Sequence, residues 1–288
     1  MAQIHHFDHG WITPTVSYVL SVLGSMLGLT CAVRLRSATA RGERAWWLVL
    51  ASLSLGGTAI WSMHFVAMMG FKVNGTPIRY DVGLTAASAI IAVVAVGVGL
   101  TIAALGKGAQ NFRIVAGGVI AGLGVAAMHY TGMAAMNLNG DVSYGMTYVG
   151  LSIGIAVVAA AVALFLAVTV RRPLVIFAAA LVMGIAVNGM HFTGMLAMSV
   201  ETHPSTGALP GATAGGMLVP IGLAVVFGII GLAYALMSAP TAEDRAAAAY
   251  LAQRREEAAA RVPQQATGPE RAGGLSSGAW TYRDRSSR

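Results

Sequence analysis

Seven long apolar runs constrain what this chain can fold into more than any other feature of its sequence. Each exceeds the 18 or so apolar residues that mark a candidate transmembrane helix, since roughly 20 residues cross the hydrocarbon core of a bilayer. Only 10% of the 288 residues are charged, against about a quarter in soluble domains. The sequence therefore predicts an all-α polytopic membrane protein with seven transmembrane helices. The predicted helices are Trp11–Val33, Ala45–Gly70, Val82–Leu105, Ile114–Met136, Tyr148–Val170, Leu174–Met198 and Met217–Met237.

Basic residues are distributed unevenly between the loops that join these helices. Eight Lys and Arg lie on the side where the first, third and fifth helices end, whereas the opposite loops hold Lys72 and Arg79. Because cytoplasmic loops are enriched in Lys and Arg, we expect the N-terminus outside and the C-terminus in the cytoplasm. The net charge of +7 is thereby explained as an orienting charge, and no nucleic-acid partner is expected. The eight residues are Arg34, Arg36, Arg41, Arg44, Lys107, Arg113, Arg171 and Arg172.

The chain is predicted to have three parts: an extracytoplasmic segment at 1–10, the membrane domain at 11–237 and a cytoplasmic tail at 238–288. Within the tail, residues 241–262 are rich in Ala, Glu and Arg and predict a short helix. The remainder is rich in Gly, Ser and Pro and is expected to be disordered. Such a tail does not house a catalytic domain, and the membrane part shows no paired carboxylates, nucleophile–base pair or phosphate loop. We therefore expect no enzyme, with any output on a separate cytoplasmic signalling protein or in the membrane part itself.

A short element occurs three times without gaps, in the second, fourth and sixth predicted helices. The copies are MHFVAMMGF at 63–71, MHYTGMAAM at 128–136 and MHFTGMLAM at 190–198, and their histidines are 65 and 62 residues apart. This period makes the first six helices three repeated helical hairpins, with the seventh helix appended. Successive hairpins enter the membrane in the same orientation, so the three histidines are expected at similar depth near the outer face.

Histidine and methionine are spaced within each copy for one face of a helix. Positions i, i+4 and i+7 share a stripe, and in the second and third copies that stripe holds one His and two Met. Phe71 replaces the last Met in the first copy. The Met before each His is turned about 100° away and needs another helix or a bend to share a ligand. The candidate metal ligands are His64, Met68, His129, Met133, Met136, His191, Met195, Met198, Met63, Met128 and Met190.

This donor set favours copper. Imidazole nitrogen and thioether sulfur are soft ligands that select copper, and Cu(I) in particular, over magnesium or calcium. Packing is the alternative, because Met is a common gap-filler and a single His can be bonded to a neighbouring helix. Ionisable groups inside a membrane are costly, however, and mark functional sites by default. We expect the three even-numbered helices to converge and to turn their histidines inward.

Other small or polar residues in the helices carry secondary expectations. The Gly residues between ligands would let another helix approach, and Gly118–Gly122 and Gly150–Gly154 are further pairs suited to helix contact. Asn188 lies one turn before His191 and either fixes an imidazole tautomer or bonds a neighbouring helix. His5, His6 and His9 precede the first helix and either capture metal or belong to an interfacial segment anchored by Trp11.

The tripled element resembles the MHYT domain family, bacterial integral membrane sensor domains named for that tetrapeptide. MHYT itself occupies 128–131, with MHFV and MHFT in the other copies, and the resemblance covers roughly residues 10–237. It implies motifs near the outer face of the bacterial cell membrane, copper bound through Met and His, and detection of O2, CO or NO. Many relatives carry cytoplasmic cyclic-dinucleotide or kinase domains. Val66-Ala67 stands for Thr-Gly in the first copy, which weakens its ligand set.

The favoured interpretation is an integral membrane sensor that uses bound copper to detect a diatomic gas or redox state. One alternative is a membrane protein for copper transport or handling, although the motifs cluster in a single leaflet. The other alternative is haem binding, since His and Met are both axial ligands of haem.

Overall fold

The computed structural model describes residues 3–5, 8, 10–106, 108–204, 207–237 and 242–261. The chain divides into two units, Met1–Ser238 and Ala239–Arg288. In the second unit the described residues form α9 (Ala242–Arg261), where the sequence predicts a short helix in the tail. The part of the tail expected to be disordered lies outside the described residues.

Seven helices of the described chain are long and apolar enough to cross a membrane, as predicted. The second is continuous through three elements, because a π-helical stretch (η1) joins α2 to the short α3 that carries the first motif. The third likewise ends in a π-helical turn, η2. The helices are α1 (Ile12–Ser37), α2–η1–α3 (Arg41–Ser52, Leu53–Ser62, Met63–Met68), α4–η2 (Val82–Leu100, Thr101–Leu105), α5 (Gln110–Ala134), α6 (Met146–Thr169), α7 (Pro173–Leu196) and α8 (Ala214–Met237).

Contacts between neighbouring helices close the first six membrane helices into a ring. α1 packs against α7 and η1, α4 against η1 and α5, and α6 against α5 and α7. Each predicted hairpin thus contributes two neighbouring helices to the ring. α3 also contacts α5 and α7, so the three motif-bearing helices meet at one end. α8 lies against η1 and α1.

Glycine permits close approach at one of the two predicted small-residue pairs. A Cβ added at Gly118 would lie 2.6 Å from Ala161 Cα, and one at Gly122 would lie 2.5 Å from Val157 Cα. α5 and α6 therefore touch along this pair, as predicted. The prediction for Gly150–Gly154 is wrong, because an added Cβ at either position meets nothing within 4 Å.

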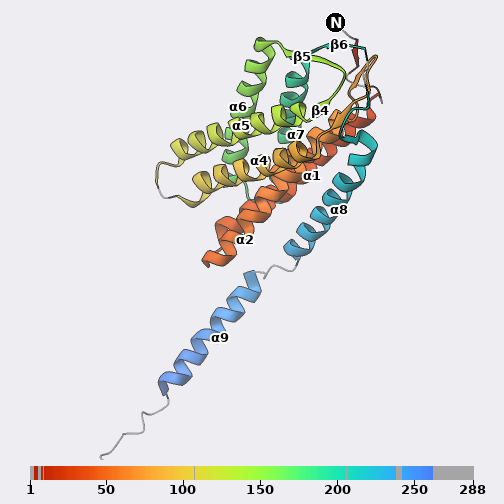
Figure 1. Ribbon diagram of the computed structural model, residues 1–288. Coiled ribbons are helices and arrows are strands. Elements are labelled where there is room, and N and C mark those ends of the chain that lie inside the picture. Colours follow the sequence, from red (N-terminus) through yellow and green to blue (C-terminus); the bar gives the residue numbers. More distant parts are fainter. Residues whose placement is uncertain are drawn as a thin grey trace, which may run out of the picture. The chain divides into compact units, whose positions relative to one another are not determined.

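Short antiparallel strands, which the sequence did not predict, cover the end of the bundle where the motifs lie; we call it the strand end (Figure 1). They form a pair β1–β2, a three-stranded sheet β4–β3–β7 and a pair β5–β6. Loop backbone at the end of a bundle must find hydrogen-bond partners once it is buried, and strand pairing supplies them. The strands are β1 (Ile4–His5), β2 (Lys72–Val73), β3 (Arg79–Tyr80), β4 (Met136–Asn137), β5 (Gly140–Tyr144), β6 (Met198–Thr202) and β7 (Ala212–Thr213).

Arginines cap helix ends at the opposite end of the bundle, which we call the arginine end. Arg36 donates to the carbonyl oxygens of Val168 and Val170, where α6 ends. Arg113 donates to Ala103 O at 2.7 Å, in the last turn of η2. Basic side chains suit the C-terminal carbonyls of helices, which lack intrahelical donors. These residues therefore hold neighbouring helices together in addition to carrying the charge asymmetry.

Candidate metal centre

Three buried histidines, one from each repeat, converge inside the strand end. His64 of α3, His129 of α5 and His191 of α7 are each 1% exposed. The Nδ1 atom of His64 lies 3.0 Å from that of His191 and 3.2 Å from that of His129. The ring centroids are 4.9 to 5.2 Å apart. The predicted inward convergence of the even-numbered helices is confirmed.

Glycine in the next repeat makes room for the back of two of these rings. The Nε2 atom of His64 lies 2.4 Å from where a Cβ of Gly132 would be, and Nε2 of His129 lies 2.3 Å from that of Gly194. Each glycine follows the histidine of its own copy by three residues. The glycines thus make room for an imidazole ring of the preceding repeat, where the sequence predicts the close approach of another helix. Ala67 holds the corresponding position in the first copy.

The three Nδ1 atoms face one another at a separation that needs something between them. Two imidazole nitrogens that both present lone pairs repel at 3.0 Å, so a proton or a cation must bridge them. One proton bridges one pair, whereas a metal ion can bind all three. At their outer edges, Nε2 of His64 and of His129 are buried and have no hydrogen-bond partner among the residues that the structure describes, and buried polar atoms in this condition call for a functional explanation.

Methionine side chains gather on the strand side of the three histidines His64, His129 and His191, which we call the triad. Met68, Met133 and Met195, one turn beyond the three histidines, belong to one buried cluster. We call it the strand-end cluster, and it separates the histidines from the end of the bundle. Its members are Phe65, Met68, Phe71, Val73, Tyr80, Met133, Met136, Met195, Met198, Val200, Met217, Ile221 and Val225.

The expectation that Met136 and Met198 share a helical stripe with the histidines is wrong. α5 ends at Ala134 and α7 at Leu196, so both sulfurs lie on strands, in β4 and β6. The strands fold back over the helix ends, and both residues return to the strand-end cluster by this route.

The methionines that precede the histidines lie in different surroundings. Met128 and Met190 pack in a second buried cluster with Ala126 and three further small or branched residues. Met63 is also buried. The predicted turn of about 100° thus separates these sulfurs from the strand-end cluster. We call the second group, Ala92, Val125, Ala126, Met128, Ala156 and Met190, the mid-bundle cluster.

Asn188 serves the second of its two expected roles. Ser17 of α1 donates to Asn188 Oδ1 at 2.8 Å, and Asn188 Nδ2 donates to Ser21 Oγ at 3.2 Å and to Gly184 O at 2.8 Å. Ser21 in turn donates to Ala59 O at 3.0 Å. Asn188 therefore ties α7 to α1 and does not orient an imidazole.

The N-terminal segment joins the strand end. The backbone of His5 pairs with Lys72 across β1–β2, and Asp8 forms an ion pair of 3.5 Å with Lys72. His6 and His9 lie outside the described residues. The predicted position of this segment on the side of the motifs is confirmed, while a metal-capturing role for its histidines stays a prediction.

Sequence reasoning missed the residues that the strands contribute. Tyr80 of β3 is 3% exposed and lies in the strand-end cluster; its hydroxyl donates to Met68 O at 3.4 Å. Burial raises the pKa of Tyr80. No periodic signal identifies such a residue, because it belongs to a short loop and not to a helix. Val73 and Val200 enter the cluster in the same way.

Known proteins resemble the chain over its membrane helices. Residues 57–118 and 122–180 match the MHYT family, described as a bacterial signalling protein N-terminal repeat. The bifunctional diguanylate cyclase/cyclic di-GMP phosphodiesterase MucR of Pseudomonas aeruginosa is 36% identical over 222 residues, 75% of this chain and 32% of MucR. The cyclic di-GMP phosphodiesterase NbdA of that species is 36% identical over 167 residues, 56% of this chain and 21% of NbdA.

The signaling protein YkoW of Bacillus subtilis is 34% identical over 162 residues, 52% of this chain and 19% of YkoW. The chain thus spans about a third or less of these curated relatives, and no solved structure matches it. The matched repeats carry the first two histidine motifs and lie within the seven-helix bundle. The chain is a multi-pass membrane sensor domain of signalling proteins and belongs to the MHYT family.

Proposed function

We propose that this sensor domain binds one copper ion at the triad and detects a diatomic gas (O2, CO or NO) or a redox change there. The observation that carries the proposal is the set of three buried imidazoles whose Nδ1 atoms face one another at 3.0 and 3.2 Å. Their grouping is the arrangement of nitrogen donors that a metal ion requires. Bound there, copper would supply a coordination position for a diatomic molecule and a one-electron change between Cu(I) and Cu(II).

The dimensions of the triad fit a single ion. Three nitrogens that each lie about 2.0 Å from one metal ion, in a trigonal arrangement, are about 3.5 Å apart. Nδ1 of His64 is slightly closer than this to Nδ1 of each of the other two histidines, so a small outward movement of the rings accommodates the ion. Met68, Met133 and Met195 place thioethers one turn beyond the histidines. This soft neighbourhood favours copper over zinc, magnesium or calcium.

The surroundings support a sensor more than a transporter or a haem protein. Among the described residues, the triad is the one group of three or more His, Cys, Asp or Glu side chains that could hold a metal ion, and a transport path would need further sites along the bundle. The ring centroids are at most 5.2 Å apart and the rings are buried, which favours a single ion over a macrocycle. The strand-end cluster keeps water from the imidazoles, while small apolar gases cross such layers readily.

Carbon monoxide tests the proposal on protein purified in nanodiscs and loaded with Cu(I). We expect an infrared C–O stretching band from bound carbon monoxide in the wild type, and none in His129→Ala. Thr193→Val is the matched control, since the Thr193 hydroxyl bonds only the Gly189 carbonyl of its own helix among its described contacts, at 2.7 Å. Copper bound without any such band would contradict gas detection, and the absence of copper would contradict the site.

We place the strand end outside the cell and the arginine end in the cytoplasm, where cyclic di-GMP signalling takes place. The arginines at the ends of α6 and η2 and the cyclic di-GMP enzymes among the relatives support this orientation. A thiol reagent that cannot cross the membrane should label Ser143→Cys in intact cells but not Ser37→Cys. Both positions are exposed, and the native Cys31 is buried. The reverse labelling would overturn the orientation.

A further inference from the structure

A large apolar cavity opens between α6 and α7, and none of the three histidines of the triad lines it. Its volume is about 560 Å³. Buried residues of other helices form its inner wall, among them Leu55 of η1, Val96 of α4 and Ala121 of α5. Its mouth carries exposed side chains such as Val158 and Val182. In a membrane helix such exposed aliphatic side chains face lipid, so the cavity opens to the hydrocarbon of the bilayer.

Small residues of α6 create this space. Gly150 and Gly154 line the cavity, and an added Cβ at either position meets nothing within 4 Å. Ala159 and Ala163 continue the small-residue lining deeper into the bundle. No charged side chain occurs among the described residues that line it, and the polar side chain among them is that of Ser25, which carries a hydroxyl group. The cavity therefore suits a ligand without charge.

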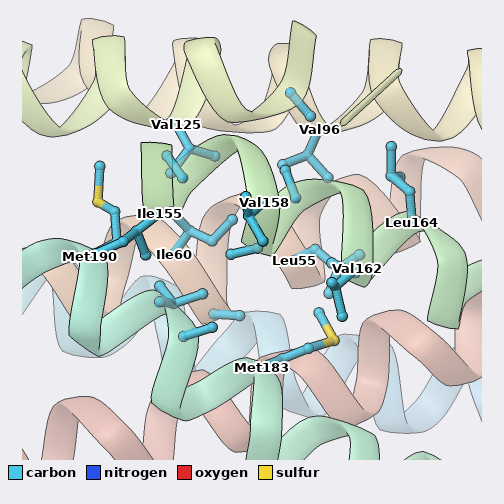
Figure 2. Close-up of a pocket in the computed structure, with 18 of the residues that line it drawn as sticks. Leu55, Ile60, Val96, Val125, Ile155, Val158, Val162, Leu164, Met183 and Met190 are labelled. Atoms are coloured by element: carbon cyan, nitrogen blue, oxygen red, sulfur yellow. The ribbon is translucent and has the colours of Figure 1, made fainter. Parts of the chain in front are cut away.

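The cavity is elongated along the helices. On α6 the lining runs from Gly150 to Leu164, which is about 20 Å at roughly 1.5 Å per residue. Figure 2 shows this extent, with Met190 and Ile155 towards one side and Leu164 towards the other. One leaflet of a bilayer contributes about 15 Å of hydrocarbon, and its chains run parallel to the spanning helices. A long, narrow apolar space with this direction matches a hydrocarbon chain better than a compact molecule.

We propose that this cavity is a binding site for one hydrocarbon chain of a lipid, inserted from the leaflet at the strand end. A void in contact with fluid hydrocarbon is unfavourable because the atoms that line it lack dispersion partners, and a chain restores those contacts. The chain enters beside Gly150, one turn from where α6 begins at Met146. At that end it packs against Met190, the neighbour of His191 and a member of the mid-bundle cluster. The bound chain thereby contacts the turn of α7 that also carries His191, whether or not the triad holds a metal.

Photolabelling tests the site in nanodiscs of phosphatidylglycerol and phosphatidylethanolamine that contain a phospholipid with a diazirine in its acyl chain. We expect mass spectrometry to find labels on inner-wall residues such as Leu55 and Val96. Gly154→Leu should lower this labelling by about tenfold, because a leucine fills the space that the chain needs. Gly189→Leu is the matched control: Gly189 is exposed on α7, an added Cβ there meets nothing within 4 Å, and the residue lies outside the cavity lining.

Ala163→Leu, deeper in the cavity, provides a second variant should Gly154→Leu not fold by circular dichroism. A free fatty acid with the same diazirine distinguishes the source of the chain: inner-wall labels from either probe support the site and identify its lipid. Inner-wall labelling that persists in both filled variants would overturn the proposal. Labels confined to the outward-facing positions of the wild type would do the same.

Discussion

Two pairs of glycines play opposite roles in this bundle. Gly132 and Gly194 lie against the imidazoles of His64 and His129 so closely that a single methyl group would collide. A Cβ added at Gly150 or Gly154 would meet nothing within 4 Å, and these two glycines line the cavity that opens to lipid. Glycine forms the helix surface in both places, and the two places differ in the groups that lie opposite the glycines. The comparison teaches that polar groups hidden from lipid require tight packing around them, whereas an apolar gap can be left for lipid to fill.

The largest effect is expected where the tight pair is disturbed. Gly132→Ala and Gly194→Ala should each destabilise the fold by roughly 1–3 kcal/mol, because the added Cβ overpacks a rigid imidazole, and each should abolish copper binding. Gly150→Ala should be neutral, or stabilising by up to about 1 kcal/mol through helix propensity. Thermal unfolding in detergent and copper analysis measure both effects. Wild-type stability and copper content in Gly132→Ala would show that the glycine does not shape the site.

A smaller effect is expected at the polar contact between α7 and α1. Asn188→Leu removes bonds with Ser17 and Ser21 and should cost about 1 kcal/mol, the scale of interhelical hydrogen bonds in membranes. The copper content per folded chain should not change, because none of the bonds of Asn188 reaches an imidazole. Unfolding in detergent and elemental analysis provide the two readouts. Loss of copper from a variant with intact helical content would return Asn188 to the metal centre.

The two methionine clusters should differ in their influence on the oxidation state of copper. Met133→Ala removes a thioether from the strand-end cluster and should weaken Cu(I) binding by about tenfold, with less effect on Cu(II), because thioethers are soft ligands. Met128→Ala, in the mid-bundle cluster, should change the preference for Cu(I) less. Competition with chelators specific for each oxidation state measures this. Equal effects of the two substitutions would mean that the clusters are not distinct in function.

The smallest effect is expected on the surface of the strand end. His203 approaches Asp141 at 2.8 Å, but the two side chains are 56% and 86% exposed. Exposed ion pairs contribute little to stability. Asp141→Asn should therefore leave the melting temperature and the copper content unchanged. A clear shift in either quantity would show that the strands β5 and β6 couple this pair to the interior.

The helices and the convergence of the histidines could be predicted because both follow from long-range regularities of the sequence. Length and hydropathy define membrane helices, and a period of 65 and 62 residues gives His64, His129 and His191 one depth. Helix ends were less predictable. A stripe of period 3.6 does not indicate where α5 and α7 end, so it predicts helical positions for Met136 and Met198, which lie on strands.

The cavity and the strands could not be predicted for a related reason. Gly118–Gly122 and Gly150–Gly154 have the same spacing, yet only the first pair meets a neighbouring helix. Which of two identical patterns is packed depends on the rotation of each helix in the ring, and this is set by all its neighbours together. The pairing of β3 with β4 and β7 likewise joins loops far apart in sequence and leaves no periodic pattern in any one of them.

Copper stoichiometry tests the central claim, a single metal centre shared by three repeats, most directly. Protein purified in detergent would be loaded with Cu(I) and freed of excess metal, and its copper content would then be measured by elemental mass spectrometry. Helical content, measured by circular dichroism, is the control for folding. We predict one copper per wild-type chain, and none in any of His64→Ala, His129→Ala and His191→Ala. Three coppers per chain, or stepwise loss of one copper for each histidine replaced, would contradict the shared centre, and unchanged copper in the triple variant would show that the triad is packing.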